Sequence, residues 1–321
     1  MSTALPDEEF GTVVRLDDGR RMYASLRGTP TEQAPTVVFE SGLASPPQVW
    51  EWVRRALPAD VPTLAYARAG SGWSDPGPRP RTVPRLSGDL HALLDAVEVT
   101  GPIVLVGHSF GGLVVRHFAG THPDRVAGAV FVDALHPREL RRSANQRRGM
   151  AWLEQSLKLS ALRASLGLAR NRIDERFDAL PGEAGRLARG QLCRAALWRA
   201  AVSELVWWKK SDPEKVEVGT FPDDVPLGVV ISGESLRNDV AHRKLQQDLL
   251  AWSRRSFAVP VREAGHFDLV LDARWARVVA DAVAAVLTAL AETTGEAEPA
   301  RASVTGDGEV SAVSEGAGDG R

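Results

Sequence analysis

The stretch Gly107-His108-Ser109-Phe110-Gly111-Gly112 decides the fold. It follows the apolar run 103–106, which is typical of a buried strand, and it precedes a helical pattern at 112–120. A serine with glycines two residues away on each side, placed between a strand and a helix, sits on a sharp turn with strained backbone angles. The pattern therefore predicts that the Ser109 hydroxyl stands above a sheet as a nucleophile, with the free amides of the following helix pointing at it.

Short apolar runs rich in Val, Ile and Leu recur on both sides of this stretch. They lie at 36–39, 63–66, 103–106, 129–132 and 227–231, and another strand is expected near 257–261. Such runs suit strands that are covered on both faces, as in a parallel sheet. Helical patterns at 84–97, 112–120 and 273–290 alternate with them, and residues 10–27 resemble a hairpin around Asp18-Gly19. We therefore expect an α/β protein with a mostly parallel central sheet and helices on both faces.

One long segment interrupts this alternation. Residues 137–220 are rich in Arg and Leu and helical in period, and they lie between two buried strand signals. They predict a helical cap inserted into a core made of residues 1–136 and 221–291. Residues 292–321 have almost nothing apolar to bury, so we expect a disordered tail there.

The bulk composition excludes several classes of protein. The 321 residues carry a formal net charge of −2, so no general field favours nucleic acid or anionic membranes. No leader-like or membrane-spanning apolar run is present, which favours a cytoplasmic protein. Cys193 is the single cysteine, and no metal-ligand spacing or dinucleotide fingerprint occurs. We expect a small-molecule substrate and no cofactor or metal, while the sequence does not define an oligomeric state.

A serine hydroxyl needs a base to act as a nucleophile. This strand–turn–helix motif orders its triad as Ser, acid and His along the chain, so the base should be a late histidine. His266 lies in Glu263-Ala264-Gly265-His266-Phe267, after the last strand signal and in a loop at the expected C-terminal edge of the sheet. His136 could line the same site, His108 should point away from it, and His242 lies in a polar helix where exposure is expected.

Acyl transfer also needs hydrogen-bond donors for the developing oxyanion. The first expected donor is the backbone N–H of Phe110, the residue after the nucleophile. The second should come from the loop after the strand at 36–39, which reads Glu40-Ser41-Gly42-Leu43-Ala44-Ser45. The N–H of Leu43 is the candidate there.

Four stretches together resemble the α/β-hydrolase superfamily, and most of all its small cap-bearing bacterial members. They are Phe39-Glu40-Ser41-Gly42-Leu43, the arginine loop from Tyr66 to Asp75, Val106 to Gly112, and Gly265-His266-Phe267. Their order and spacing match over roughly residues 10–290. The chain departs from the usual His-Gly of the oxyanion loop, where it has Ser41-Gly42, and from Tyr-Asp-Arg, where it has Ala67. The resemblance implies the fold and a serine nucleophile, and it does not name a substrate.

The resemblance leaves the acid of the triad open. In this family the acid is commonly an Asp three residues past the Gly that follows the sixth central strand, and here that position holds Leu236. Some relatives, such as certain haloalkane dehalogenases, place the acid at the end of the preceding strand, where this chain has Asp133. Asp239 and Glu234 lie in the usual loop but out of register. We favour Asp133, then Asp239, then Glu234.

The expected activity is hydrolysis of an ester or related acyl bond through an acyl-enzyme on Ser109. Amide, lactone, thioester and carbon–carbon bond hydrolysis stay open. Because the usual acid is absent at Leu236, an alternative is a ligand receptor or regulator on the same fold. Perhydrolase activity is a third alternative without separate support.

Overall fold

The computed structural model describes residues 10–170 and 173–294. Its centre is an eight-stranded sheet in the order β1-β2-β4-β3-β5-β6-β7-β8. The strands are β1 (Thr12–Arg15), β2 (Arg21–Arg27), β3 (Thr36–Glu40), β4 (Thr63–Tyr66), β5 (Ile103–His108), β6 (Val126–Val132), β7 (Leu227–Ser232) and β8 (Ser256–Val261). β1 and β2 form the predicted antiparallel hairpin, β2 also pairs antiparallel with β4, and every later pair is parallel.

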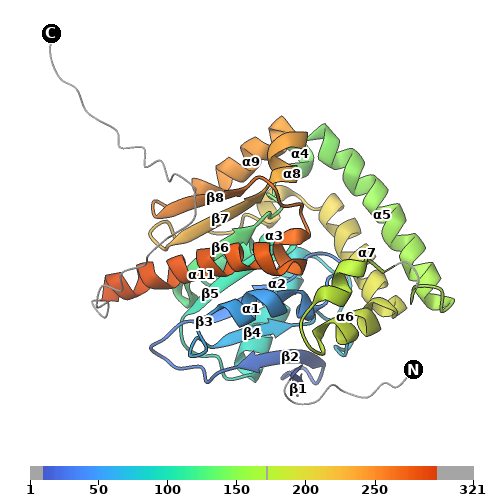
Figure 1. The fold of residues 1–321 in the computed structure, drawn as a ribbon, viewed down its shortest axis with the longest axis horizontal. Helices are drawn as coiled ribbons and strands as arrows, with labels where there is room; N and C mark the ends of the chain where they lie inside the picture. The colour runs from blue at the N-terminus through green and yellow to red at the C-terminus, as the bar shows by residue number, and fades with distance from the viewer. Residues whose placement is uncertain (1–9, 171–172, 295–321) are drawn as a thin grey trace, which may run out of the picture.

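Helices cover both faces of this sheet (Figure 1). The described α-helices are α1 (Glu51–Ala56), α2 (Val83–Ala96), α3 (Gly111–Thr121), α4 (Glu139–Arg142), α5 (Ala144–Ser165), α6 (Ala184–Leu192), α7 (Ala195–Lys210), α8 (Gly233–Asn238), α9 (Val240–Leu250), α10 (Asp268–Leu271) and α11 (Ala273–Thr294). The described 3₁₀ turns are η2 (Pro47–Trp50), η3 (Pro123–Arg125), η5 (Glu175–Ala179) and η6 (Pro213–Lys215). The predicted mostly parallel sheet with helices on both faces is confirmed.

The alternation of side chains along the strands explains the two layers. Val104 and Val106 of β5 point to a core shared with α1 and α11, while Leu105 points to a core shared with α2 and α3. Because successive strand residues face opposite sides, a strand covered on both faces must be apolar throughout. β3, β5 and β7 are buried along their whole length, which is why they read as continuous apolar runs.

The helices α4 to α7 fall between β6 and β7, within the segment predicted as a cap. α5, α6 and α7 lie together beside the sheet (Figure 1). Their contact with the core is apolar: Leu157, Leu205 and Trp208 pack against Phe110 and Leu113 at the start of α3. These helices therefore sit over the turn that carries Ser109, the predicted nucleophile.

The C-terminal tail was predicted to begin at residue 292. α11 continues to Thr294, and the remainder of the predicted disordered tail, 295–321, lies outside the described residues. In the part of the chain that the structure describes, no helix is long and apolar enough to cross a membrane. Over the same residues, no group of three His, Cys, Asp or Glu side chains could hold a metal ion.

Candidate active site

Ser109 occupies the turn between β5 and α3. Its φ is +54°, in the left-handed region that a non-glycine residue rarely adopts and that often marks functional sites. The glycines on either side make this turn possible. A Cβ at Gly107 would lie 2.8 Å from Val115 Cγ2, and one at Gly111 would lie 2.3 Å from the carbonyl oxygen of Glu40. The sequence motif is thus explained by close backbone approach on both sides of the serine.

Asp133 and His266 meet beside this turn. The Nδ1–H of His266 donates to Oδ2 of Asp133 at 2.6 Å, although 133 residues separate them in the chain. Asp133 follows β6 with a φ of +42°, and it is almost completely buried. Ser232, at the end of β7, donates its backbone N–H to Oδ1 at 3.0 Å and its hydroxyl to Oδ2 at 2.9 Å.

These donors hold Asp133 as a carboxylate. Burial alone would raise the pKa of the Asp133 carboxyl, but the hydrogen bond and attraction from His266, together with the Ser232 amide, keep that pKa below its usual range. An ionised partner at Nδ1 fixes the ring orientation and leaves Nε2 unprotonated in the neutral imidazole. In the described structure no residue forms a hydrogen bond with Nε2 of His266, so this nitrogen is free to accept a proton.

Two more contacts hold the backbone of His266. Its N–H donates to Oε2 of Glu234 at 3.2 Å, and its carbonyl accepts from Nε2 of His108 at 3.2 Å. The His108 and His266 rings lie 4.5 Å apart. His108 was expected to point away from the site, and it is not among the residues that line the cavity around Ser109 and His266; its buried ring packs against His266 instead. Burial and the neighbouring His266 lower the pKa of His108 to about 3, so His108 stays neutral near pH 7.

Ser109, Asp133 and His266 share one cavity of about 290 Å³. Leu135, Met150 and Phe267 contribute apolar wall, and the remaining wall is polar: Gln146, Glu234, Ser235, Asp239 and His242. Within the described chain the Ser109 hydroxyl forms no hydrogen bond. Hydrogen bonds between a serine and its base are often long when no substrate is bound, so the missing bond does not exclude Ser109 and His266 as partners.

The two other candidate acids lie close by with different contacts. Asp239 precedes α9 and accepts the backbone N–H groups of Ala241 and His242 at 2.9 and 3.2 Å, which makes it a helix cap. Among the described residues, the Glu234 carboxylate accepts one hydrogen bond, from the backbone N–H of His266. Of the three carboxylates left open by the sequence, the structure brings Asp133 alone to the imidazole.

The predicted oxyanion loop packs directly against Ser109. A Cβ built on Gly42 would lie 3.3 Å from Cβ of Ser109, so the loop backbone lies against the serine. The backbone N–H groups of Leu43 and Phe110 donate to no acceptor among the described residues. Phe110 is the N-cap residue of α3, where free amides are expected. Both predicted donors are therefore without a hydrogen-bond acceptor in the described part of the chain.

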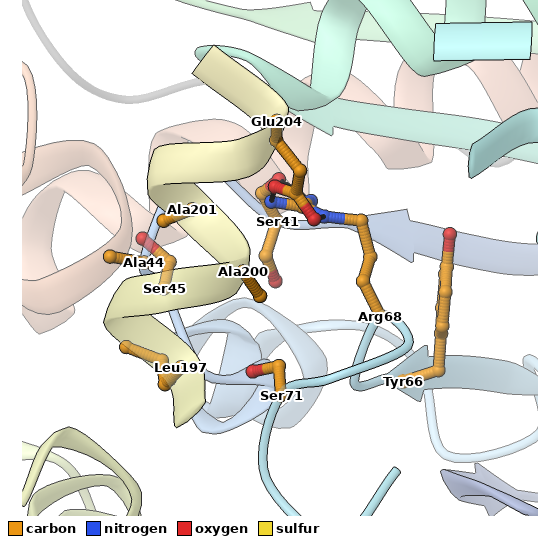
Figure 2. A pocket seen from close by; sticks show the side chains of 10 residues that line it. All are labelled: Ser41, Ala44, Ser45, Tyr66, Arg68, Ser71, Leu197, Ala200, Ala201 and Glu204. Atoms are coloured by element: carbon orange, nitrogen blue, oxygen red, sulfur yellow. Dashed lines mark hydrogen bonds and ion pairs between the residues drawn. The ribbon is translucent and has the colours of Figure 1, made fainter. Parts of the chain in front are cut away.

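Behind this loop lies a buried ionic cluster that the sequence did not reveal. Arg68, which follows β4, contacts Glu40 at the end of β3 and Glu204 of α7. Figure 2 shows the Glu204 side chain reaching from α7 to the Arg68 guanidinium group, beside Ser41. The cavity there is about 10 Å³, room for about one water molecule, so the cluster is not a substrate site.

His242 is a second finding that sequence reasoning missed. It was expected to be exposed on a polar helix, and that prediction is wrong: its side chain is buried. Its Nδ1 contacts Oε1 of Glu139 at 2.7 Å, and its Nε2 contacts the hydroxyl of Ser235 at 2.9 Å. Burial opposes its charge, but Glu139 and the more distant Asp133 raise its pKa above the usual value. The paired glutamate is what allows a charged ring to be buried here.

His136 was expected to line the site and does not. It is buried next to Trp252, with ring centroids 5.5 Å apart, and it is absent from the residues that line the cavity.

Comparison with known proteins places the chain in a family. The model of the alpha/beta hydrolase family matches residues 37–282, which run from β3 into the first half of α11. The chain belongs to this family. A segment of 92 residues is 39% identical to a lipase of Mycobacterium tuberculosis, and covers 29% of this chain and 34% of the lipase. Another, of 113 residues, is 31% identical to a putative carbamate hydrolase of Caulobacter vibrioides, and covers 35% of this chain and 42% of that protein. The matched segments thus span less than half of each relative.

Solved structures agree with this alpha/beta hydrolase assignment over most of the chain. A thermophilic esterase from Thermogutta terrifontis aligns with a TM-score of 0.61 and 18% identity, over 87% of this chain and 98% of its own. An enol-lactonase from Burkholderia xenovorans aligns with a TM-score of 0.59 and 18% identity, over 85% and 100%. At this identity the likeness shows the fold.

Proposed function

We propose that the protein hydrolyses an ester or a related acyl bond of a small molecule through an acyl-enzyme on Ser109. The observation that carries the proposal is the hydrogen bond between Asp133 and His266, because both residues line the same cavity as Ser109. An oriented imidazole beside a serine on a strained turn is the arrangement that activates a hydroxyl. Family relatives described as a lipase and a putative carbamate hydrolase are consistent with acyl chemistry.

The proposed reaction has two halves. The Ser109 oxygen attacks the substrate carbonyl while Nε2 of His266 takes the hydroxyl proton, and the N–H groups of Leu43 and Phe110 bind the resulting oxyanion. Collapse expels the alcohol, which receives the proton from His266. Water then attacks the acyl-enzyme, gives a proton to His266 and releases the acid, and the proton returns to Ser109. Asp133 stabilises the imidazolium in both halves.

The size of the cavity favours small substrates. About 290 Å³ is at the lower end of the range for ligand pockets, and the wall is a mixture of apolar and polar groups. The receptor alternative depended on the missing acid at Leu236. Since Asp133 contacts His266, no observation now favours that alternative over hydrolysis.

The decisive test is the Ser109→Ala variant with p-nitrophenyl acetate. We expect turnover to fall to the background rate, because the nucleophile is lost, while the melting temperature stays near that of the wild type. A fluorophosphonate probe should label the wild type at one site, which peptide mapping should place at Ser109. Turnover that survives the substitution, or folded wild type that the probe does not label, would refute the assignment.

A further inference from the structure

The guanidinium group of Arg68 uses all five of its N–H donors inside the protein. Nε and Nη2 donate to the two carboxylate oxygens of Glu204 at 3.1 and 2.9 Å. Nη1 donates to Oε1 of Glu40 and to the carbonyl oxygen of Ser41, both at 2.6 Å. The second hydrogen of Nη2 goes to the carbonyl oxygen of Gly42 at 2.9 Å. Two of the five acceptors are thus backbone carbonyls of the loop beside Ser109.

The contact with Gly42 bears on the oxyanion donor. The carbonyl of Gly42 and the N–H of Leu43 belong to one planar peptide unit, in which the C=O and N–H bonds of a trans peptide point in opposite directions. Arg68 holds the oxygen on the far side of the loop. Gly42 packs against Ser109, with 3.3 Å between its built Cβ and Cβ of the serine.

We propose that Arg68 is a positioning residue that aims the Leu43 N–H at the oxyanion, and that Glu204 makes the cap helix α7 part of this device. A charge-assisted bond to the carbonyl fixes the peptide plane, and it also polarises the N–H at the other end. The inference rests on the proposed function, since it assigns a support to the oxyanion hole of the same site.

Arginine suits this position in a way that lysine does not. Five acceptors converge on one planar fork, whereas an ammonium group has three donors and no fixed plane. Burial opposes the positive charge of Arg68, but attraction from Glu204 and Glu40 raises its pKa, so the guanidinium is charged at every working pH. Tyr66 donates its hydroxyl to the second oxygen of Glu40, and burial raises the pKa of that carboxyl.

A purely stabilising role is the rival explanation, and the chain offers a matched control for it. Arg54 of α1 is as buried as Arg68, at 8% exposure each. Arg54 makes four hydrogen bonds, to the side chains and carbonyls of Ser25 and Thr63, and none to the oxyanion loop. Replacing either arginine by lysine therefore disturbs a buried polar network, but only Arg68→Lys removes a donor from the Gly42 carbonyl, which then keeps only the longer bond from the Ser45 N–H at 3.4 Å.

The test compares Arg68→Lys, Arg54→Lys and Glu204→Gln by turnover of p-nitrophenyl acetate and by inhibition with phenylboronic acid. The boronate binds a serine oxygen as a tetrahedral anion, so it reports on the oxyanion donors. We expect Arg68→Lys to lower kcat by up to about 10²-fold and to raise the boronate inhibition constant by a similar factor, with KM changed less than threefold. Glu204→Gln should show the same pattern at about tenfold, and Arg54→Lys should change neither quantity more than twofold.

The backbone order parameter of the Leu43 amide, measured by ¹⁵N relaxation, gives a readout that does not depend on activity. We expect it to fall in Arg68→Lys and Glu204→Gln and to match the wild type in Arg54→Lys. Wild type without probe labelling would refute the proposed hydrolase. Active wild type with Arg68→Lys and Glu204→Gln both unchanged in kcat, boronate affinity and Leu43 order parameter would refute the positioning role alone. Equal losses in Arg54→Lys would also refute it. If Arg68→Lys does not fold, Glu204→Gln decides the question.

Discussion

Asp133→Asn is the sharpest perturbation of the site, because it keeps the side-chain volume and changes one proton acceptor into a donor. The asparagine oxygen can still accept the Ser232 N–H, as Oδ1 does at 3.0 Å. Its NH₂ group then faces Nδ1 of His266, where the carboxylate oxygen now accepts at 2.6 Å. Two donors cannot pair, so the ring must move its proton to Nε2, the nitrogen that serves Ser109.

The magnitude follows from this tautomer change. With the proton on Nε2 the imidazole cannot act as a base, and the equivalent substitution in a Ser-His-Asp triad costs about 10⁴-fold in kcat. That corresponds to about 5.4 kcal/mol of transition-state stabilisation. The loss of charge-assisted hydrogen bonds from Ser232 and His266 should lower the free energy of unfolding by about 1–3 kcal/mol.

The assay is kcat/KM for p-nitrophenyl acetate, with urea denaturation as the measure of stability. Asp239→Asn is the comparison variant for the rival acid: Asp239 lines the same cavity, but it forms no hydrogen bond with His266 in the described structure, and asparagine is as good a helix cap as aspartate. We expect it to stay within threefold of the wild type. Turnover of Asp133→Asn within tenfold of the wild type, or an equal loss in Asp239→Asn, would show that the acid has been assigned wrongly.

Two further predictions concern stability. Burial lowers the pKa of His108 to about 3 and that of His136 to about 4, against about 6.5 when unfolded, so acid protonates the unfolded chain first. As the pH falls from 6.5 toward 4, each should remove up to about 1.4 kcal/mol of unfolding free energy per pH unit; urea midpoints that stay flat from pH 6.5 to 5 would contradict this. Gly111→Ala should cost about 1–3 kcal/mol, because its Cβ would lie 2.3 Å from the carbonyl oxygen of Glu40, whereas Gly88→Ala in α2 meets nothing within 4 Å and should be neutral or stabilising. Equal urea midpoints for the two variants would contradict the close approach of Gly111 to the Glu40 carbonyl in the turn at Ser109.

The elements that the sequence predicted are those whose signals are local. The strand at 103–106, the turn at Ser109 and the helix after it lie within 18 residues, and each is set by burial on both faces or by close backbone approach. The contacts that the sequence did not predict join residues that are far apart in the chain. Arg68 and Glu204 are 136 residues apart, and neither residue type signals burial until the other is placed beside it.

His242 shows the same limit from the opposite direction. Its helix, α9, is polar enough in sequence to be read as exposed, yet its buried stripe includes His242, Leu245 and Leu249. Glu139, 103 residues earlier, is the partner that allows the histidine into the interior. The sequence ranked Asp133 first among the three candidate carboxylates but left the choice open for this reason: which one meets the imidazole depends on the ends of β6 and β7 being neighbours.

Ser109 and Asp133 are held by the sheet, whereas His266 is held by separate contacts in a loop. Ser109 and Asp133 both lie at left-handed turns after the adjacent strands β5 and β6, and their turns are joined by backbone bonds from Ser109 N to Val132 O and from Leu135 N to Ser109 O. The proposed nucleophile, Ser109, and the proposed acid, Asp133, are therefore fixed to one another by the sheet itself. His266, the proposed base, lies in the loop after β8, and its hydrogen bonds among the described residues are its side-chain bond to Asp133 and its backbone contacts with Glu234 and His108. Because no strand carries His266, its position relative to Ser109 depends on these three contacts.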